Sequence, residues 1–305
     1  MQKDWKYRGI FAPVLTPYKE NGEIDYDSLR KMVDFTIDCG CHGIVPTANA
    51  AEFDTLSDEE HHETIRVIVN QTNGRVPVVA GAAGWSIRHS IANAKYAQDL
   101  GVDAVMATAP VIKPTGWETV REFYHQLDAA LDVPIVIQNA PPFGPEMSPA
   151  QMFQLMDECR NIMYVKEESA TEINYVGQLA EQGPKVVPDK FKGVMSGNSG
   201  LTIIDCYRRG SCGCMPANHY PDVFVKIWDL MEAGKFDEAY AIHEDIAPLM
   251  LVEGMYWMPF FYYVLYRRGI FKTDYYRGRA PRMTEKTYRQ VDRLLKLAEQ
   301  HYVIK

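Results

Sequence analysis

The stretch from 135 to 166 reads IVIQNAPPFGPEMSPAQMFQLMDECRNIMYVK and contains the unit that decides the fold. An apolar run, Ile135–Ile137, is followed by a proline-bearing junction, an amphipathic segment and a second apolar run, Met163–Lys166. Ser148 and Pro149 have the residue types of a helix N-cap and a first helical position. An apolar run, a helix and another apolar run in this order indicate a βαβ unit with parallel strands.

The same alternation recurs along most of the chain. The runs are continuously apolar, as expected for strands that are buried on both faces. Eight such units predict a (β/α)8 TIM barrel; an open doubly wound sheet is disfavoured, because no Gly-x-Gly-x-x-Gly follows the first run. The expected strands are Gly9–Leu15, Gly43–Pro46, Val76–Ala80, Ala104–Ala107, Ile135–Ile137, Met163–Lys166, Gly193–Ser196 and Cys212–Pro216, and the expected helices are 26–39, 58–71, 86–99, 117–130, 149–158, 172–182 and 199–208.

The residues after Pro216 are more than one closing helix needs, and their pattern is helical. We expect a barrel over residues 1–220 and a C-terminal helical extension over residues 221–305. The aromatic stretch 255–263 is expected to pack the extension onto the barrel; the alternatives are a subunit interface or a wall of the substrate pocket. The expected helices of the extension are 221–233, 236–250, 254–268 and 284–301.

Composition limits the possible partners. The chain of 305 residues is 47% hydrophobic and 24% charged, with a formal net charge of −8 and no basic stripe, so we expect no nucleic-acid partner. We expect no signal peptide, because residues 1–6 have no apolar core followed by a small-residue cleavage site, and no membrane span, because no apolar run approaches 18 residues. With the reduced thiols expected below, this favours a cytoplasmic protein. Two Cys-Gly-Cys pairs are too tightly spaced for a zinc ribbon, so we expect reduced, buried cysteines and no metal site.

Lys166 is the first candidate for chemistry, because barrel active sites form at the carboxyl ends of the strands. Alternation puts Tyr164, Lys166 and Glu168 on one face of the strand, and Glu167 on the other, toward the helices. Inside a barrel, lost hydration favours the neutral amine, which attacks a ketone to form an imine. Glu168 is then placed to move protons beside the imine. The competing interpretations are a strand-end lysine that reaches solvent and a carboxylate paired with a surface lysine.

Several polar or small residues follow the other strands. Gln138 ends the fifth strand, next to the sixth, and an amide there orients a hydroxyl or a water but is no acid or base. The loop after the second strand is made of small residues whose backbone N–H groups can approach a carboxylate closely. His219 is expected to be a core or capping histidine rather than a ligand or base. The expected substrate-binding residues are Asn49, Ala50, Ala51, Gln138, Ser196 and Asn218.

These residues, read in order, resemble the dihydrodipicolinate synthase / N-acetylneuraminate lyase family of class I lyases. The resemblance covers nearly the whole chain and places the family's Schiff-base lysine on Lys166. It implies a barrel with a C-terminal helical extension, usually a homotetramer, which acts on a small-molecule 2-keto acid and needs no cofactor. The matching motifs are Gly9–Pro17, Glu52 with Thr55–His61, Asn139-Ala140-Pro141, Val165-Lys166-Glu167, Ser196-Gly197 and Gly210-x-x-Gly213.

The chain departs from the family pattern where the family carries its proton relay. The family's Gly-Thr-Thr-Gly-Glu loop reads Ala48-Asn49-Ala50-Ala51-Glu52 here, the tyrosine at the end of the fifth strand falls on Gln138, and a second tyrosine falls near Val111 or Ile112. The missing relay argues against the two activities in the family's name. At these positions the chain resembles the 2-keto-3-deoxy-L-arabonate dehydratases, which share the Ala-Asn-x-x-Glu, Gln-x-Ala-Pro and Lys-x-Glu motifs.

The resemblance implies a lyase that forms an imine between Lys166 and a 2-keto-3-deoxy sugar acid and then eliminates water, with Glu168 as the proton carrier. A pyruvate-type aldolase on the same imine is the alternative within the family. A third hypothesis, from another class, is a non-catalytic 2-keto-acid-binding protein that lost the relay. The presence of both Lys166 and Glu168 on one face speaks against it, because an unused buried charge is costly.

Overall fold

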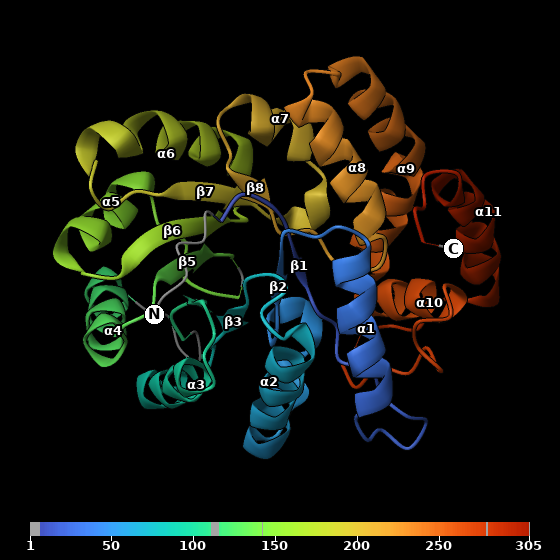
Figure 1. Cartoon of the computed structure of the whole chain (residues 1–305), viewed down its shortest axis with the longest axis horizontal. Coiled ribbons are helices and arrows are strands. Elements are labelled where there is room, and N and C mark those ends of the chain that lie inside the picture. The colour runs from blue at the N-terminus through green and yellow to red at the C-terminus, as the bar shows by residue number, and fades with distance from the viewer. Residues whose placement is uncertain (1–6, 111–115, 142, 279, 305) are drawn as a thin grey trace.

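A ring of eight parallel strands with helices around it forms the centre of the molecule (Figure 1). The structure is a computed structural model, and it describes residues 7–110, 116–141, 143–278 and 280–304. The predicted (β/α)8 barrel with a C-terminal helical extension is confirmed. The strands are β1 (Gly9–Pro13), β2 (Gly43–Val45), β3 (Val79–Gly81), β4 (Ala104–Ala107), β5 (Ile135–Asn139), β6 (Ile162–Glu167), β7 (Gly193–Ser196) and β8 (Gly213–Cys214).

The strand order closes the sheet into a barrel. The continuous ladder runs β2-β1-β8-β7-β6-β5-β4-β3, which leaves β2 and β3 as its two ends. A bridge between Ile44 and Val78 joins these ends, and the Ile44 N–H donates to the Pro77 carbonyl at 3.0 Å. The carboxyl ends of all eight strands therefore meet at one rim, where a barrel builds its site.

The barrel helices follow the strands in turn. Ser57 and Ser148 each accept from the backbone N–H three residues on and form a complete capping box at a helix start. The segment expected as one helix over 199–208 is shorter, because Asn198 and Ser199 have φ of 40° and 55° and break it. The helices are α1 (Tyr26–Asp38), α2 (Asp58–Thr72), α3 (Ile87–Asp99), α4 (Trp117–Ala130), α5 (Pro149–Glu158), α6 (Glu172–Val186), α7 (Ile203–Arg208) and α8 (Pro221–Glu232).

Three further helices, α9 (Phe236–Tyr256), α10 (Met258–Arg267) and α11 (Glu285–Glu299), lie on one side of the barrel (Figure 1). The break between α9 and α10 falls at Trp257 instead of the expected 251–253. Since α8 packs against β1, it completes the ring of barrel helices. The domain division at residue 220 stays a prediction. Because α8 packs on the barrel, the helices outside the barrel begin with α9.

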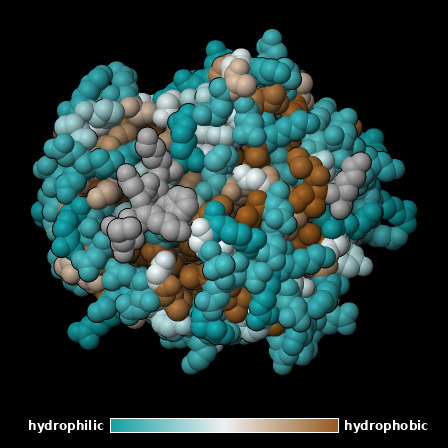
Figure 2. Space-filling model, viewed as in Figure 1, coloured by the Kyte–Doolittle hydropathy of each residue, from teal (hydrophilic) through white to brown (hydrophobic). Residues whose placement is uncertain are grey.

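The core has two parts. An inner cluster fills the barrel with side chains such as Phe11, Met106, Tyr164 and Met215, and a larger outer cluster lies between the strands, the helices and the extension. The six cysteines are free, and five of them are buried. The face seen in Figure 2 is mostly hydrophilic, with hydrophobic residues in patches between polar ones. None of the described helices is long and apolar enough to cross a membrane.

Candidate active site

Strand β6 brings Lys166 into the barrel. Tyr164, two residues earlier, belongs to the inner cluster, whereas Val165 belongs to the outer one, so the predicted alternation is confirmed. The Lys166 residue is only 4% exposed. Its amine is therefore held at the floor of the barrel mouth.

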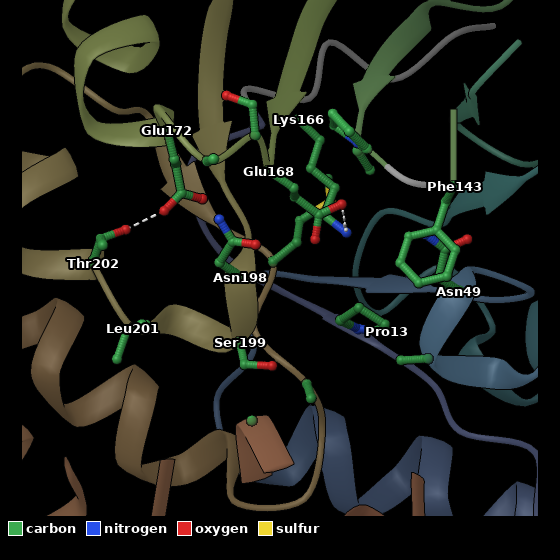
Figure 3. A pocket seen from close by; sticks show the side chains of 18 of the residues that line it. Pro13, Asn49, Phe143, Lys166, Glu168, Glu172, Asn198, Ser199, Leu201 and Thr202 are labelled. Carbon is green, nitrogen blue, oxygen red and sulfur yellow. Dashed lines mark hydrogen bonds and ion pairs between the residues drawn. The ribbon is translucent and has the colours of Figure 1, made fainter. Parts of the chain in front are cut away.

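Glu168 and Gln138 surround this amine. The Lys166 Nζ lies 2.9 Å from Glu168 Oε2, and the Gln138 Nε2 donates to the same oxygen at 3.0 Å (Figure 3). The β5–β6 ladder pairs Gln138 directly with Lys166, as the strand order predicted. Gly197 makes room for Glu168, since a Cβ at this glycine would lie 2.3 Å from Glu168 Cγ. The carboxylate is thus fixed from two sides beside the amine.

Glu167 lies on the opposite face of β6, as expected. Its carboxylate accepts from Asn139 Nδ2 at 2.7 Å and from the Ser169 N–H at 2.8 Å. Burial raises the pKa of Glu167 from its ordinary value to about 7. Because Asn139 ends β5, this bond ties the carboxyl ends of β5 and β6 together behind Lys166.

A cavity of about 780 Å³ opens at the rim in front of Lys166, which is within the usual size range of small-molecule sites. Figure 3 shows Lys166 and Glu168 on one wall, Glu172 with Asn198 on another, and Phe143 beside Asn49 on a third. The residues that line it are Pro13, Ala48, Asn49, Ala50, Ala140, Pro141, Phe143, Lys166, Glu168, Ser169, Ala170, Thr171, Glu172, Ile173, Asn174, Asn198, Ser199, Leu201, Thr202, Met215, Ala217, Met250, Glu253, Gly254, Trp257 and Phe261.

The small-residue loop after β2 forms a short 3-10 turn over Asn49–Ala51. Asn49 and Ala50 line the cavity, and as the first two residues of the turn their N–H groups have no acceptor inside it. The Ala51 N–H donates back to the Ala48 carbonyl at 2.9 Å. Of the three predicted loop residues, Asn49 and Ala50 therefore have N–H groups left free by the turn itself, whereas that of Ala51 is already used.

Glu52 holds this loop in place from below. It has φ of 52°, a left-handed conformation, and its residue is 2% exposed. Its carboxylate accepts from the backbone N–H of Arg277 at 3.3 Å and of Gly278 at 2.6 Å. Burial raises the pKa of Glu52, and the two backbone hydrogen bonds act in the opposite direction because they favour the carboxylate. The loop thus depends on the segment between α10 and α11.

The structure does not bring every predicted residue to the cavity. Ala51 is fully buried beneath its loop, and Ser196 is buried on β7 beside its ladder partner Cys214. Asn218 points to the helix layer, where its Nδ2 donates to Thr36 Oγ1 at 2.7 Å. None of these three is among the lining residues, and neither is Gln138, which is buried and donates to Glu168. The predicted positions of the second relay tyrosine, Val111 and Ile112, lie outside the described residues.

Glu172 lines the cavity, although the sequence pattern did not single it out. Its Oε1 accepts from the Gly197 N–H at 2.7 Å, its Oε2 accepts from the Thr202 hydroxyl, and burial raises its pKa. It follows Glu168 by four residues. This spacing alone does not place Glu172 at the cavity, because the two residues are separated by a turn whose shape the sequence does not give. It links the start of α6 to the loop after β7.

His219 is a core residue, in keeping with the expectation. It is fully buried and stacks on Phe261 with ring centroids 4.9 Å apart. Its Nε2 lies 3.1 Å from Glu253 Oε2, without the angle of a hydrogen bond, and the same oxygen accepts from the Tyr220 hydroxyl at 2.9 Å. This cluster joins the end of β8 to α9.

A metal has no evident place in the described part of the chain, where no three His, Cys, Asp or Glu side chains gather to hold an ion. The reactive groups of the cavity are an amine and carboxylates. Such a set supports amine addition to a carbonyl and proton transfer next to it.

Comparisons with known proteins agree with this geometry. The profile of the dihydrodipicolinate synthetase family matches residues 6–298. A 4-hydroxy-tetrahydrodipicolinate synthase from Methanococcus maripaludis (strain C6) is 32% identical over 246 residues, 80% of this chain and 82% of that protein. An L-2-keto-3-deoxyarabonate dehydratase from Azospirillum brasilense is 30% identical over 248 residues, 80% of this chain and 79% of that protein.

The solved structures show the same architecture. The crystal structure of a dihydrodipicolinate synthase from Rhodopseudomonas palustris superposes with a TM-score of 0.88 at 24% identity and covers 96% of this chain and 98% of that one. The family profile spans nearly the whole chain, and the curated relatives match at 30% identity or more. The chain therefore belongs to the dihydrodipicolinate synthetase family, whose members are lyases of the Schiff-base type.

Proposed function

We propose that this protein dehydrates a 2-keto-3-deoxy sugar acid, of the 2-keto-3-deoxypentonate type, through an imine on Lys166. The observation that carries the proposal is the 2.9 Å contact between Lys166 Nζ and Glu168 Oε2 at the wall of the cavity. An amine with its own proton acceptor in contact is the pair that this reaction requires.

The first step is imine formation. Glu168 takes a proton from the Lys166 ammonium group, and the neutral amine attacks the C2 ketone of the substrate. Glu168 returns this proton to the C2 oxygen of the carbinolamine, which leaves as water, and the protonated imine remains beside the Glu168 carboxylate. Gln138 donates to the Glu168 oxygen that faces the amine and so keeps the carboxylate directed at the reacting carbons.

The second step is elimination. The iminium acidifies the C3 hydrogens, and Glu168, directly or through water, removes one of them. The same proton then goes to the C4 hydroxyl, which leaves as water, and a C3–C4 double bond forms. Hydrolysis of the imine and tautomerisation release the product, which for a keto-deoxy-pentonate is 2-ketoglutarate semialdehyde. Glu168 ends each cycle as it began.

Substrate binding follows from the lining residues. We assign the substrate carboxylate to the N–H groups of Asn49 and Ala50, since the net charge of −8 gives no general attraction to an anion. Asn49 orients hydroxyls, whereas Gln138 is not among the lining residues and acts through its bond to Glu168. The predicted roles of Ala51, Ser196 and Asn218 would require a rearrangement of the bonds and packing described above.

A pyruvate-type aldolase is the second candidate, and the names of the methanogen relatives favour carbon–carbon chemistry. We prefer dehydration because the residue beside Lys166 at the end of β5 is Gln138, and an amide exchanges no proton at neutral pH. That leaves Glu168 as the proton carrier beside the imine, and the Azospirillum brasilense relative bears the name of a dehydratase.

Borohydride trapping tests the imine. The protein is incubated with pyruvate or with a keto-deoxy acid, reduced, digested and analysed by mass, with Lys166→Arg as the matched control. We expect the adduct on Lys166 and none in the control. No adduct with any 2-keto acid would reject the proposal and leave the non-catalytic binding protein. Product masses from keto-deoxy pentonates and hexonates then distinguish loss of water from carbon–carbon cleavage.

The family resemblance also leads us to propose a cytoplasmic homotetramer. Light scattering on the purified protein measures the assembly directly. A mass of one or two chains would contradict the tetramer without affecting the proposed reaction.

A further inference from the structure

The cavity is larger than the proposed substrate needs. A keto-deoxy-pentonate has about ten non-hydrogen atoms, and at the roughly 30 Å³ that one water takes in the liquid they account for about 300 Å³. The cavity measures about 780 Å³. More than half of it therefore remains unfilled by a bound keto-deoxy-pentonate.

The extension supplies one wall of this remaining space. Five lining residues come from α9, α10 and the corner between them. In Figure 3 orange and brown ribbons lie across the cavity from Lys166. The wall is open at Gly254, where an added Cβ would meet nothing within 4 Å. The residues are Met250, Glu253, Gly254, Trp257 and Phe261.

Trp257 occupies the corner in a strained conformation. Its φ is 54° and its ψ is −107°, a combination that a bulky side chain rarely adopts. A glycine would take this conformation freely, yet the residue at this position is tryptophan, which has the largest side chain of all. Strain of this kind is typical of functional sites, where the surroundings force the residue into place. The ring lines the cavity and lies 5.2 Å from that of Phe143, measured between centroids.

The corner is anchored from behind by Glu253. The Glu253 carbonyl accepts from the Trp257 N–H at 2.7 Å, and its carboxylate accepts from the Tyr220 hydroxyl at 2.9 Å. The Glu253 residue is 2% exposed and belongs to the lining, so it supports the wall from a largely buried position. The backbone of the corner at Trp257 is thus linked through Glu253 to Tyr220, the residue at which α8 begins.

We infer that Trp257 is a specificity-determining residue for the end of the substrate that lies beyond the reacting carbons. Its ring presents a negatively polarised face to the C–H groups of a hydroxylated carbon chain. Gly254 keeps the adjacent space open for that chain. The inference rests on the proposed function, and it assigns selection of a long, hydroxylated keto acid over pyruvate to the helical extension.

Two variants test this assignment. Gly254→Leu adds bulk at a lining position where a Cβ would meet nothing within 4 Å, and Trp257→Gly removes the ring while it relieves the strained backbone. The matched control is Gly177→Leu, which makes the same change inside α6 at a position that does not line the cavity. The measurements are kcat/KM for a keto-deoxy pentonate and hexonate, and the rate of pyruvate trapping on Lys166.

We expect both cavity variants to lower kcat/KM for the keto-deoxy hexonate by about tenfold or more, with KM carrying most of the loss, and to lower it less for the shorter pentonate. Pyruvate trapping changes by less than about threefold, and the Gly177 control changes neither quantity. Equal losses with pyruvate and with the longer acids, or no loss at all, would overturn the assignment and leave the proposed reaction intact. Failure to trap any 2-keto acid in the unaltered protein rejects both. Should Trp257→Gly not fold, Gly254→Leu alone decides.

Discussion

Glu167 and Glu168 are neighbours in the chain but lie on opposite faces of β6. Glu168 faces the cavity, contacts the Lys166 amine and accepts from Gln138. Glu167 faces the helices, where it is fully buried and accepts from neutral groups of Asn139 and Ser169. The same side chain is next to a cation in one place and deprived of water in the other.

The difference teaches that the face of the strand on which a glutamate lies, rather than its residue type, decides whether it contacts the cavity or the helix layer. A carboxylate beside an amine and a cavity can exchange protons with a ligand. A carboxylate sealed against the helix layer can only hold backbone and amide groups together. Substitutions on the inner face should therefore change turnover, whereas those on the outer face should change stability.

The largest effect is expected from Glu168→Gln. The amide keeps the size of the side chain but removes the proton carrier, so kcat should fall by roughly 10²–10⁴. Borohydride trapping should continue, though more slowly, because the amine remains and water can take its proton in place of Glu168. The control is Glu181→Gln, on the exposed face of α6. Turnover that survives Glu168→Gln would show that another group removes the C3 proton.

Gly197→Ala should come next. Its Cβ would lie 2.3 Å from Glu168 Cγ, so the carboxylate has to move away from Lys166. A displacement of about 1 Å at a reacting group costs on the order of a hundredfold, and we expect kcat to fall by about tenfold to a hundredfold. Gly177→Ala in α6 is the matched control. A kcat within twofold of the unaltered protein would mean that Glu168 needs no fixed position.

Gln138→Ala removes one of the two contacts of the Glu168 carboxylate. The 2.9 Å contact with Lys166 remains, so the loss is partial, and kcat should fall by about tenfold, as for one hydrogen bond to a charged group. The measurement is kcat over pH 6–9, and Gln154→Ala, on the exposed surface of α5, is the control. A loss as large as that of Glu168→Gln would instead make Gln138 essential to the chemistry.

Glu167→Gln should change turnover least and stability most clearly. Burial raises the pKa of Glu167 from the ordinary value of 4.5 to about 7, so the folded state favours the protonated acid. Its contribution is complete below pH 4.5 and is lost as the pH rises through 7, by on the order of 3 kcal/mol. Urea unfolding between pH 5 and 8 measures this: the unaltered protein should lose stability relative to Glu167→Gln. Parallel pH profiles would contradict it.

Much of this comparison could be predicted from the sequence. The period of two fixes which side chains share a face of β6, and strand order puts Gln138 beside Lys166. Both depend on local geometry alone, and the structure reproduces them.

Other parts of the site depend on tertiary packing, which local patterns do not contain. Strand β8 is only two residues long, so alternation does not reach Asn218, whose side chain turns to Thr36. The break at Trp257 needs a positive φ that nothing in the sequence marks, since glycine is the residue that usually adopts it. The wall formed by the extension was therefore predicted mainly as core packing.

The Glu52 contact has a consequence for how the enzyme can be shortened. Its carboxylate is satisfied by backbone N–H groups of Arg277 and Gly278, which are more than two hundred residues away in the chain. A fragment that ends after the last strand would keep all eight strands, yet Glu52 would lose both backbone donors directly beside the turn over Asn49–Ala51. Hydrogen exchange at the amides of Asn49 and Ala50 would then show whether the segment between α10 and α11 is folded in place. The turn beside the cavity therefore depends on a segment more than two hundred residues later in the chain.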